Sequence, residues 1–117
     1  MKLKVTVDAA YAFDMLAIAQ IKAEKIDSID ANWRFQDLEN EIRHQISEEL
    51  FYKIILSKEY TEVYNANLIV WEMVRDSRDN KVTAQEVDNA NYDRHIKKMS
   101  LQHKFFNSEL TEEKKRD

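Results

Sequence analysis

The least polar stretch of the chain runs from Asp14 to Ile26. Its apolar residues recur three and four positions apart, which is the pattern of a buried α-helix. They are Leu16, Ile18, Ala19, Ile21 and Ile26. A helix this apolar needs cover on more than one side. We therefore expect the more polar helices that follow it to pack around it.

Similar spacing predicts two helices in the first half of the chain. The first covers about residues 9–26, with Asp8 as its N-cap. The second follows a polar turn, has Asp30 as its cap, and extends for roughly 25 residues. Ser57 either ends this second helix or lies within it.

Apolar spacing in the second half of the chain predicts two more helices. The third carries an aromatic and aliphatic stripe that is typical of a core or an interface, formed by Tyr60, Tyr64, Leu68 and Trp71. A polar loop over residues 76–81 follows it. Thr83 and Glu86 then have the spacing of a capping box, which begins a fourth helix that ends near Phe106.

The two ends of the chain have patterns of their own. Residues 1–7 alternate between apolar and polar, as in a short half-buried strand. A lone strand cannot satisfy its backbone, so this segment either lies on the helices as an extended arm or pairs with the arm of another copy. Residues 108–117 form a charged tail. The whole pattern predicts one all-α domain over residues 1–117, an antiparallel bundle of three to four helices with a short N-terminal extended arm.

Composition supports the helical prediction and excludes several functions. Gly, Pro and Cys are all absent, whereas average usage would give roughly eight glycines and six prolines. Turns that need positive φ must then use Asn, Asp or Ser. Glycine-dependent phosphate loops and dinucleotide folds are excluded, as are disulfides and Cys-ligated zinc. We accordingly expect a cytoplasmic protein.

Charge and hydropathy narrow the class of partner. The 22 acidic residues against 18 Lys and Arg give a formal net charge of −4, which disfavours a generic nucleic-acid binder. No apolar run has the length of a membrane span or the pattern of a signal peptide. We therefore expect neither a membrane nor a nucleic-acid partner.

Metal chemistry has weak support in the sequence. Five pairs of acidic residues stand three positions apart, against roughly four expected by chance in such a chain. The histidines are His44, His95 and His103. The last two are eight positions apart, whereas a ligand pair on a helix prefers three or four. We assign no metal, no cofactor and no catalytic residue.

A polar line on the fourth helix is the best candidate for binding. Asn91, Arg94 and Lys98 stand in line between apolar positions. Two cations four positions apart repel each other mildly, so this pair favours an anionic partner. One alternative is a carboxylate of the same chain, such as Asp14 or Glu72. The other is a bound phosphate or carboxylate ligand, for which Arg provides a bidentate fork.

Four segments also carry a recognisable pattern in a fixed order. They comprise Asp14, Ile18, Ile21, Lys22, Lys25, Ile26 and Asn32; then Asn67, Val70, Trp71, Asp76 and Arg78; then Asn91, Arg94 and Lys98; and finally Ser108, Glu112, Glu113 and Lys114. The pattern resembles a small uncharacterised family of bacterial and phage helical proteins, with D-K-x-x-I-L-x-I-K-x-x-K-I, N-x-x-L-W-x-x-E-D-x-x-R, N-D-x-R-x-x-x-K and S-x-x-x-E-E-K. The chain departs from it at Met15, where the family has lysine, and at Val74 and Arg75, where it has Glu-Asp.

The resemblance adds residues of interest but implies no activity. Bacterial members resemble accessory proteins of surface-glycan loci, and phage members suggest a phage origin for this chain. Together with the polar line, the resemblance yields seven ligand-binding candidates: Asp14, Lys22, Trp71, Glu72, Asn91, Arg94 and Lys98. Whether they converge on an open cleft or a closed core decides between a binding and a structural role.

We therefore expect a non-enzymatic helical interaction or accessory protein that forms homo-oligomers. Its apolar surplus favours self-association, and comprises Trp33, Tyr60, Tyr64, Trp71, Phe105 and Phe106. The alternative is a small all-α ligand-binding or hydrolytic protein. It would act on a small anionic ligand, a phosphorylated or nucleotide-sugar compound, through Arg94 and Lys98.

Overall fold

The computed structural model describes residues 1, 3, 6–77 and 82–107. Within them the chain forms five α-helices: α1 (Ala9–Ile26), α2 (Ile29–Gln45), α3 (Glu48–Ile55), α4 (Lys58–Ser77) and α5 (Ala84–Phe106). The all-helical class is thus confirmed. The first helix has the predicted extent, and α1 packs against α2, α4 and α5, as its apolar character required.

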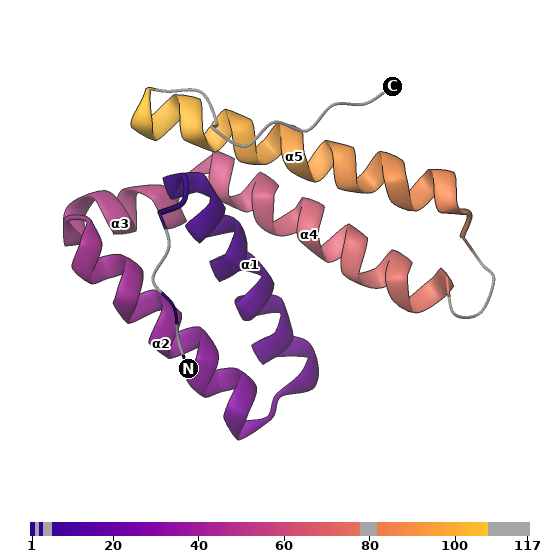
Figure 1. Ribbon diagram of the computed structural model, residues 1–117, viewed down its shortest axis with the longest axis horizontal. Coiled ribbons are helices and arrows are strands. Elements are labelled where there is room, and N and C mark those ends of the chain that lie inside the picture. Colours follow the sequence, from indigo (N-terminus) through magenta and orange to yellow (C-terminus); the bar gives the residue numbers. More distant parts are fainter. Residues whose placement is uncertain (2, 4–5, 78–81, 108–117) are drawn as a thin grey trace.

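The helices form two antiparallel hairpins (Figure 1). The first hairpin consists of α1 and α2, the second consists of α4 and α5, and the short helix α3 connects them. The hairpins meet where α1 and α4 begin and α5 ends, which we call the closed end. They diverge toward the turn between α1 and α2 and the C-terminal half of α4, which we call the open end.

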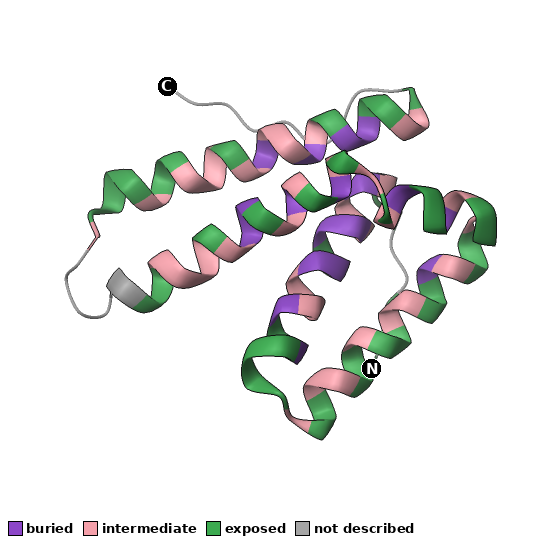
Figure 2. Ribbon diagram, turned by 180° about the vertical axis from the view of Figure 1, so that it is seen from behind, coloured by how far each residue is buried: buried purple, intermediate pink, exposed green. Residues whose placement is uncertain are grey.

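The hydrophobic core lies at the closed end. Phe13 of α1 packs against Phe51 of α3 and Tyr60 of α4, with ring centroids 6.0 and 6.3 Å apart. Leu101 of α5 is fully buried in the same core. Burial coloured on the ribbon shows buried residues gathered where the hairpins meet and exposed ones toward their far ends (Figure 2). One core therefore holds both hairpins together.

The predicted second helix is divided in two, and this boundary was not predicted. Ile46 has an extended backbone (φ −126°, ψ 170°) and ends α2. Ser47 then caps α3 by accepting a hydrogen bond from the N–H of Leu50 at 3.1 Å. The predicted break near Ser57 is present, since α3 ends at Ile55 and α4 begins at Lys58.

The helix starts are capped by short polar side chains, although not always the predicted ones. Ser28, rather than Asp30, caps α2 by accepting from the N–H of Ala31 at 3.0 Å. The capping box of Thr83 and Glu86 at the start of α5 is confirmed in both directions. Such caps are each worth about 1 kcal/mol because they satisfy N–H groups that the helix leaves unpaired.

The first turn of α1 is capped from another helix. Asp8 occupies the N-cap position but makes no side-chain cap hydrogen bond. Instead, the side-chain oxygen Oε1 of Gln102 on α5 accepts a hydrogen bond from the buried N–H of Ala10 at 2.9 Å. This contact fixes the start of α1 against α5 at the closed end.

The helix ends show how a chain without glycine turns. Asp27 after α1 and Asn107 after α5 have left-handed backbones, with φ of 50° and 47°. Their backbone N–H groups bond to carbonyls of the preceding turn. Asn and Asp tolerate this region better than other residues with a Cβ, so the predicted use of such residues in place of glycine is confirmed.

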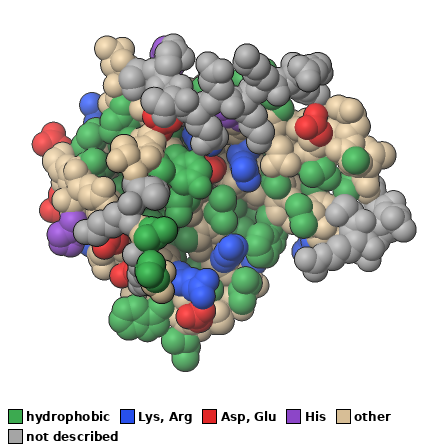
Figure 3. All heavy atoms as spheres, viewed as in Figure 1, with side chains coloured by type: hydrophobic (Ala, Val, Ile, Leu, Met, Phe, Trp, Pro, Cys, Tyr) green, Lys and Arg blue, Asp and Glu red, His purple; other side chains and the backbone are tan. Residues whose placement is uncertain are grey.

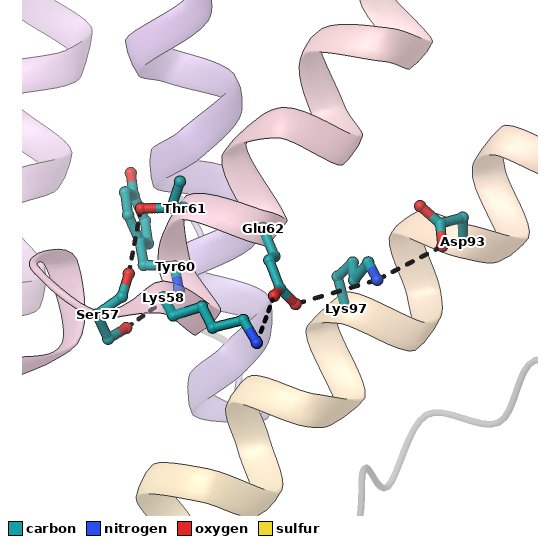
Figure 4. Close-up of polar contacts among 7 residues, drawn as sticks. All are labelled: Ser57, Lys58, Tyr60, Thr61, Glu62, Asp93 and Lys97. Atoms are coloured by element: carbon teal, nitrogen blue, oxygen red, sulfur yellow. Dashed lines mark hydrogen bonds and ion pairs between the residues drawn. The ribbon is translucent and has the colours of Figure 1, made fainter.

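Polar contacts join the two helices of the second hairpin (Figure 4). The Glu62 carboxylate of α4 lies 3.6 Å from the Lys58 ammonium and 4.0 Å from that of Lys97 on α5. Lys97 also lies 3.9 Å from Asp93. These groups are partly or largely exposed, so the ion pairs orient α4 against α5 and add little to the free energy of unfolding.

The predicted extended arm falls partly on residues 2, 4 and 5, which lie outside the described residues, as do the tail at 108–117 and part of the polar loop at 78–81. Leu3 and Val7 of the arm are 79% and 45% exposed. In the described part of the chain, none of the helices combines the length and the apolar character needed to cross a membrane.

Candidate functional site

A cleft of about 390 Å³ lies at the open end between α1, α4 and α5. Its apolar walls are formed by Ile18, Ile21, Val70, Trp71 and Val74. Its polar groups are Asn67, Arg75 and Arg94. The space-filling view shows Lys and Arg side chains set among hydrophobic ones across the middle of one face (Figure 3).

The cleft exists because the apolar faces of two helices separate. Ile18 and Ile21 stand three positions apart on α1, and Val70 and Val74 stand four apart on α4. Each pair lies on one face of its helix. At the closed end such faces meet in the core, but here the hairpins diverge. Ile18, Val70 and Val74 are partly or largely exposed, whereas Ile21 is 1% exposed.

Asp14 is buried and is not one of the described residues that line this cleft. Its side chain is 3% exposed, and its carboxylate accepts a 2.7 Å hydrogen bond from the Asn67 amide. The same amide also donates to the carbonyl of Val63 at 3.0 Å. Both Asn67 N–H groups are therefore used, and Asp14 is held in a closed contact between α1 and α4.

Lys98 is also buried, away from the cleft lining. It is 6% exposed, and its ammonium lies 5.3 Å from the ring centroid of Tyr11, a cation–π distance. Arg94 and Lys98 are thus one helical turn apart on α5, yet only Arg94 lines the cleft. The polar line predicted from the sequence crosses the boundary between cleft and core.

Of the charged residues among the seven candidates, Arg94 is the one that lines the described cleft. It is half-buried and lines the cleft. Within the described chain, its guanidinium makes no hydrogen bond and no ion pair. None of the described residues lining the cleft carries a carboxylate. A half-buried cation against apolar walls favours an anionic partner, because few waters solvate it there.

Lys22 belongs to a different hollow. This second hollow, of about 440 Å³, lies between α1 and α2, and Lys22 lines it together with Met15 and Arg34. Arg34 is paired with Asp30 at 3.2 Å, and both side chains are 77% exposed. Ile18 lines both hollows, so they are neighbours on the surface of α1.

Of the three remaining candidates, only Trp71 is among the described residues that line the cleft. Trp71 lines the cleft and is half-buried. The Asn91 amide donates to the carbonyl of Val87 on its own helix at 3.2 Å. Glu72 is half-buried on α4 and is not among the described cleft residues. The structure therefore brings Trp71 and Arg94 together and separates them from Lys22 and Lys98.

Much of the apolar surplus is used inside a single chain. Tyr60 is 6% exposed, and its hydroxyl donates to Gln20 at 3.0 Å. Burial, followed by the Glu39 carboxylate, raises the pKa of Tyr60 above its ordinary value of 10.0. Burial and a hydrogen bond to Glu24 raise the pKa of Tyr64 as well. Trp33, by contrast, is 67% exposed.

Several residues of the cleft were not singled out as binding candidates. Asn67 and Val70 were noted through the resemblance, Ile18 and Ile21 also through the apolar spacing of the first helix, and Arg75 as a departure from the resemblance. A signal was present in the sequence: Asn67 is a polar residue on the otherwise apolar face of its helix. Val74 and Arg75 both line the cleft, and the exposed Arg75 adds a positive charge to its rim.

Metal ligation has no support in this site. In the part of the chain that the structure describes, no three His, Asp or Glu side chains lie close enough to hold one ion. Comparison with protein-family models, curated proteins and solved structures finds no match. What the chain binds must therefore be inferred from its own surface.

Proposed function

We propose that the chain is a non-enzymatic helical interaction module that assembles with a second copy of itself through the outer face of α2. The observation that carries this proposal is a pair of exposed apolar side chains. Ile29 is 82% exposed and Trp33 is 67% exposed. They stand four positions apart, so they form one apolar patch on the helix surface.

The patch points away from the rest of the chain. Phe35, Leu38 and Ile42 lie on the inner face of α2 and pack against the core. Ile29 and Trp33 occupy the opposite face by helical geometry, as their exposure shows. Exposed tryptophan is costly in water and is enriched at the centres of protein interfaces.

Charges beside the patch suit a second copy. Asp30 and Arg34 form a largely exposed ion pair next to Ile29 and Trp33. A two-fold interface brings the same surface of two copies together, so each contact occurs twice. A patch with one acid and one base can therefore pair Asp30 of each copy with Arg34 of the other, while the tryptophans are buried between them.

Light scattering across a dilution series tests this proposal. The wild-type chain should form a dimer or larger oligomer at high concentration, and Trp33→Glu should remain a monomer. Leu56→Glu is the matched control, because Leu56 is equally apolar and 82% exposed but lies at the end of α3. A wild-type monomer at high concentration would refute self-association. Dissociation by Leu56→Glu alone would refute the assignment to α2.

A ligand-binding function is a second candidate, supported by Arg94 in its cleft. The sequence paired Arg94 with Lys98 for a phosphorylated or nucleotide-sugar compound. Lys98 does not line the cleft, so only one of the two cations supports such a ligand. Thermal-shift screening of nucleotides and sugar phosphates, with and without Mg²⁺, tests this candidate. No shift with any of them would count against it.

A further inference from the structure

The cleft at the open end combines an unusual cation with apolar walls. Arg94 is half-buried, and no hydrogen bond or ion pair from the described chain reaches its guanidinium. Among the described residues, other cations either have a partner, as Arg34 has in Asp30, or are exposed to water, as Lys22 is. The Arg94 guanidinium therefore has no carboxylate partner in the described chain and is only partly solvated.

The apolar walls of the cleft indicate what the rest of an anionic ligand would be like. Two aliphatic side chains of α1 and three apolar side chains of α4, including Trp71, form most of its lining. Its volume of about 390 Å³ is at the lower end of the usual range for small-molecule sites. A ligand with one acidic group and a compact apolar body fits this lining. A nucleotide sugar carries too many polar groups for it.

The acidic group is better matched by a carboxylate than by a phosphate. Arg94 offers one planar fork, which binds the two oxygens of a carboxylate side by side. Arg75, the other cation of the cleft, already has an interaction within the chain and lies on its exposed rim. A phosphate dianion would therefore bring a second charge for which the cleft provides no comparable partner.

We propose that the cleft between α1, α4 and α5 binds a small amphiphilic carboxylate. The carboxylate pairs with the guanidinium of Arg94, and the apolar body lies against Trp71 and Ile18. Asp14 does not contact such a ligand, because it is not a lining residue of the described cleft; it is 3% exposed, and its carboxylate accepts a hydrogen bond from Asn67. This binding is independent of self-association, since Trp33 lies on the outer face of α2.

Isothermal titration calorimetry with octanoate tests the proposal. Octanoate should bind the wild-type chain, and octanamide, which has the same shape without the charge, should bind at least about tenfold more weakly. Arg94→Gln should weaken octanoate binding about tenfold or more, the usual effect of losing a hydrogen bond to a charged group. Lys22→Gln is the control, because Lys22 is an exposed cation of the neighbouring hollow.

A second variant distinguishes a specific effect from misfolding. Val74 is 44% exposed on the cleft wall, so Val74→Glu should fold normally. Its new carboxylate should compete with octanoate for Arg94 and weaken binding about tenfold. Circular dichroism confirms that each variant keeps the wild-type helix content and melting temperature.

Four results would overturn the proposal. The first is equal affinity for octanoate and octanamide, and the second is unchanged octanoate affinity in folded Arg94→Gln. The third is no octanoate binding up to about 5 mM, several times the roughly 1 mM dissociation constant of a weak complex. The fourth is tighter binding of octylphosphonate than of octanoate. The last result would assign the cleft to phosphorylated ligands. None of these results depends on Trp33, so they leave the proposed self-association to its own test.

Discussion

The two halves of α4 have very different surroundings. In the first half, Tyr60, Val63, Ala66 and Asn67 are all buried, with α1, α3 and α5 packed around them. In the second half, from Leu68 to Arg75, no residue is buried, and several line the cleft. The same helix therefore contributes to the core at the closed end and keeps a partly exposed surface at the open end (Figure 2).

The difference follows from how many helices pack around each half of α4. At the closed end, α3 fills the space between the hairpins, and the aromatic rings of Phe13, Phe51 and Tyr60 interlock. At the open end no described helix occupies the corresponding space between the hairpins. Apolar area that folding leaves exposed remains available for a ligand or a second chain.

The largest expected effect is a core truncation at the closed end. Phe13→Ala should lower the free energy of unfolding by about 3–5 kcal/mol, because it removes a 1% exposed ring that contacts two others. Val74→Ala at the open end should cost less than about 1 kcal/mol. Urea unfolding followed by circular dichroism measures both. Equal costs would mean that stability is shared evenly along the hairpins.

The next effect concerns the buried contact between Asp14 and Asn67. Asn67→Leu should cost about 2–3 kcal/mol, because it leaves the buried carboxylate without its donor. The double variant Asp14→Leu with Asn67→Leu should recover most of this loss, since replacing both partners with apolar groups is nearly neutral. Strictly additive costs in the same unfolding experiment would show that the two side chains do not act as a pair.

A smaller effect follows from the buried Tyr60 hydroxyl. Its pKa in the folded chain is raised above 10.0, so between pH 10 and that higher value only the unfolded chain loses the proton. Stability is therefore complete below pH 10 and falls above it, by up to about 1.4 kcal/mol per pH unit. Tyr60→Phe should flatten this decline in urea unfolding at pH 9 to 11, and Tyr64→Phe should flatten it less. Parallel declines in wild type and Tyr60→Phe would contradict this origin.

The sequence predicted the helical class and the extent of α1 because both depend on local patterns. The break after Ile46 was missed for a physical reason: Ile42, Ile46 and Leu50 continue one apolar stripe through it. The informative signal was the cap, since Ser47 accepts from the N–H of Leu50 and two glutamates follow it in the first turn of α3. Periodicity alone does not reveal a bend between two helices that bury the same face.

The cleft could be predicted only in part. Arg94 and Trp71 were among the candidates, but so were Lys98 and Lys22, which are not among the described residues that line the cleft. Apolar residues such as Ile18 and Val70 have the same spacing whether the hairpins close or diverge. Whether Arg94 meets a cleft and Lys98 the core depends on where the hairpins separate, and that is a tertiary property.

The chain contains two tryptophans, and they report on the two proposed surfaces separately. Trp33→Phe leaves Trp71 as a probe of the cleft, and Trp71→Phe leaves Trp33 as a probe of the outer face of α2.

Fluorescence of these two variants tests the division between surfaces most directly. Octanoate should change the emission of Trp71 and leave that of Trp33 constant, whereas dilution should shift the emission of Trp33 alone. The proposed division would be contradicted if octanoate changed the emission of both tryptophans. It would also be contradicted if neither octanoate nor dilution changed the emission of either tryptophan.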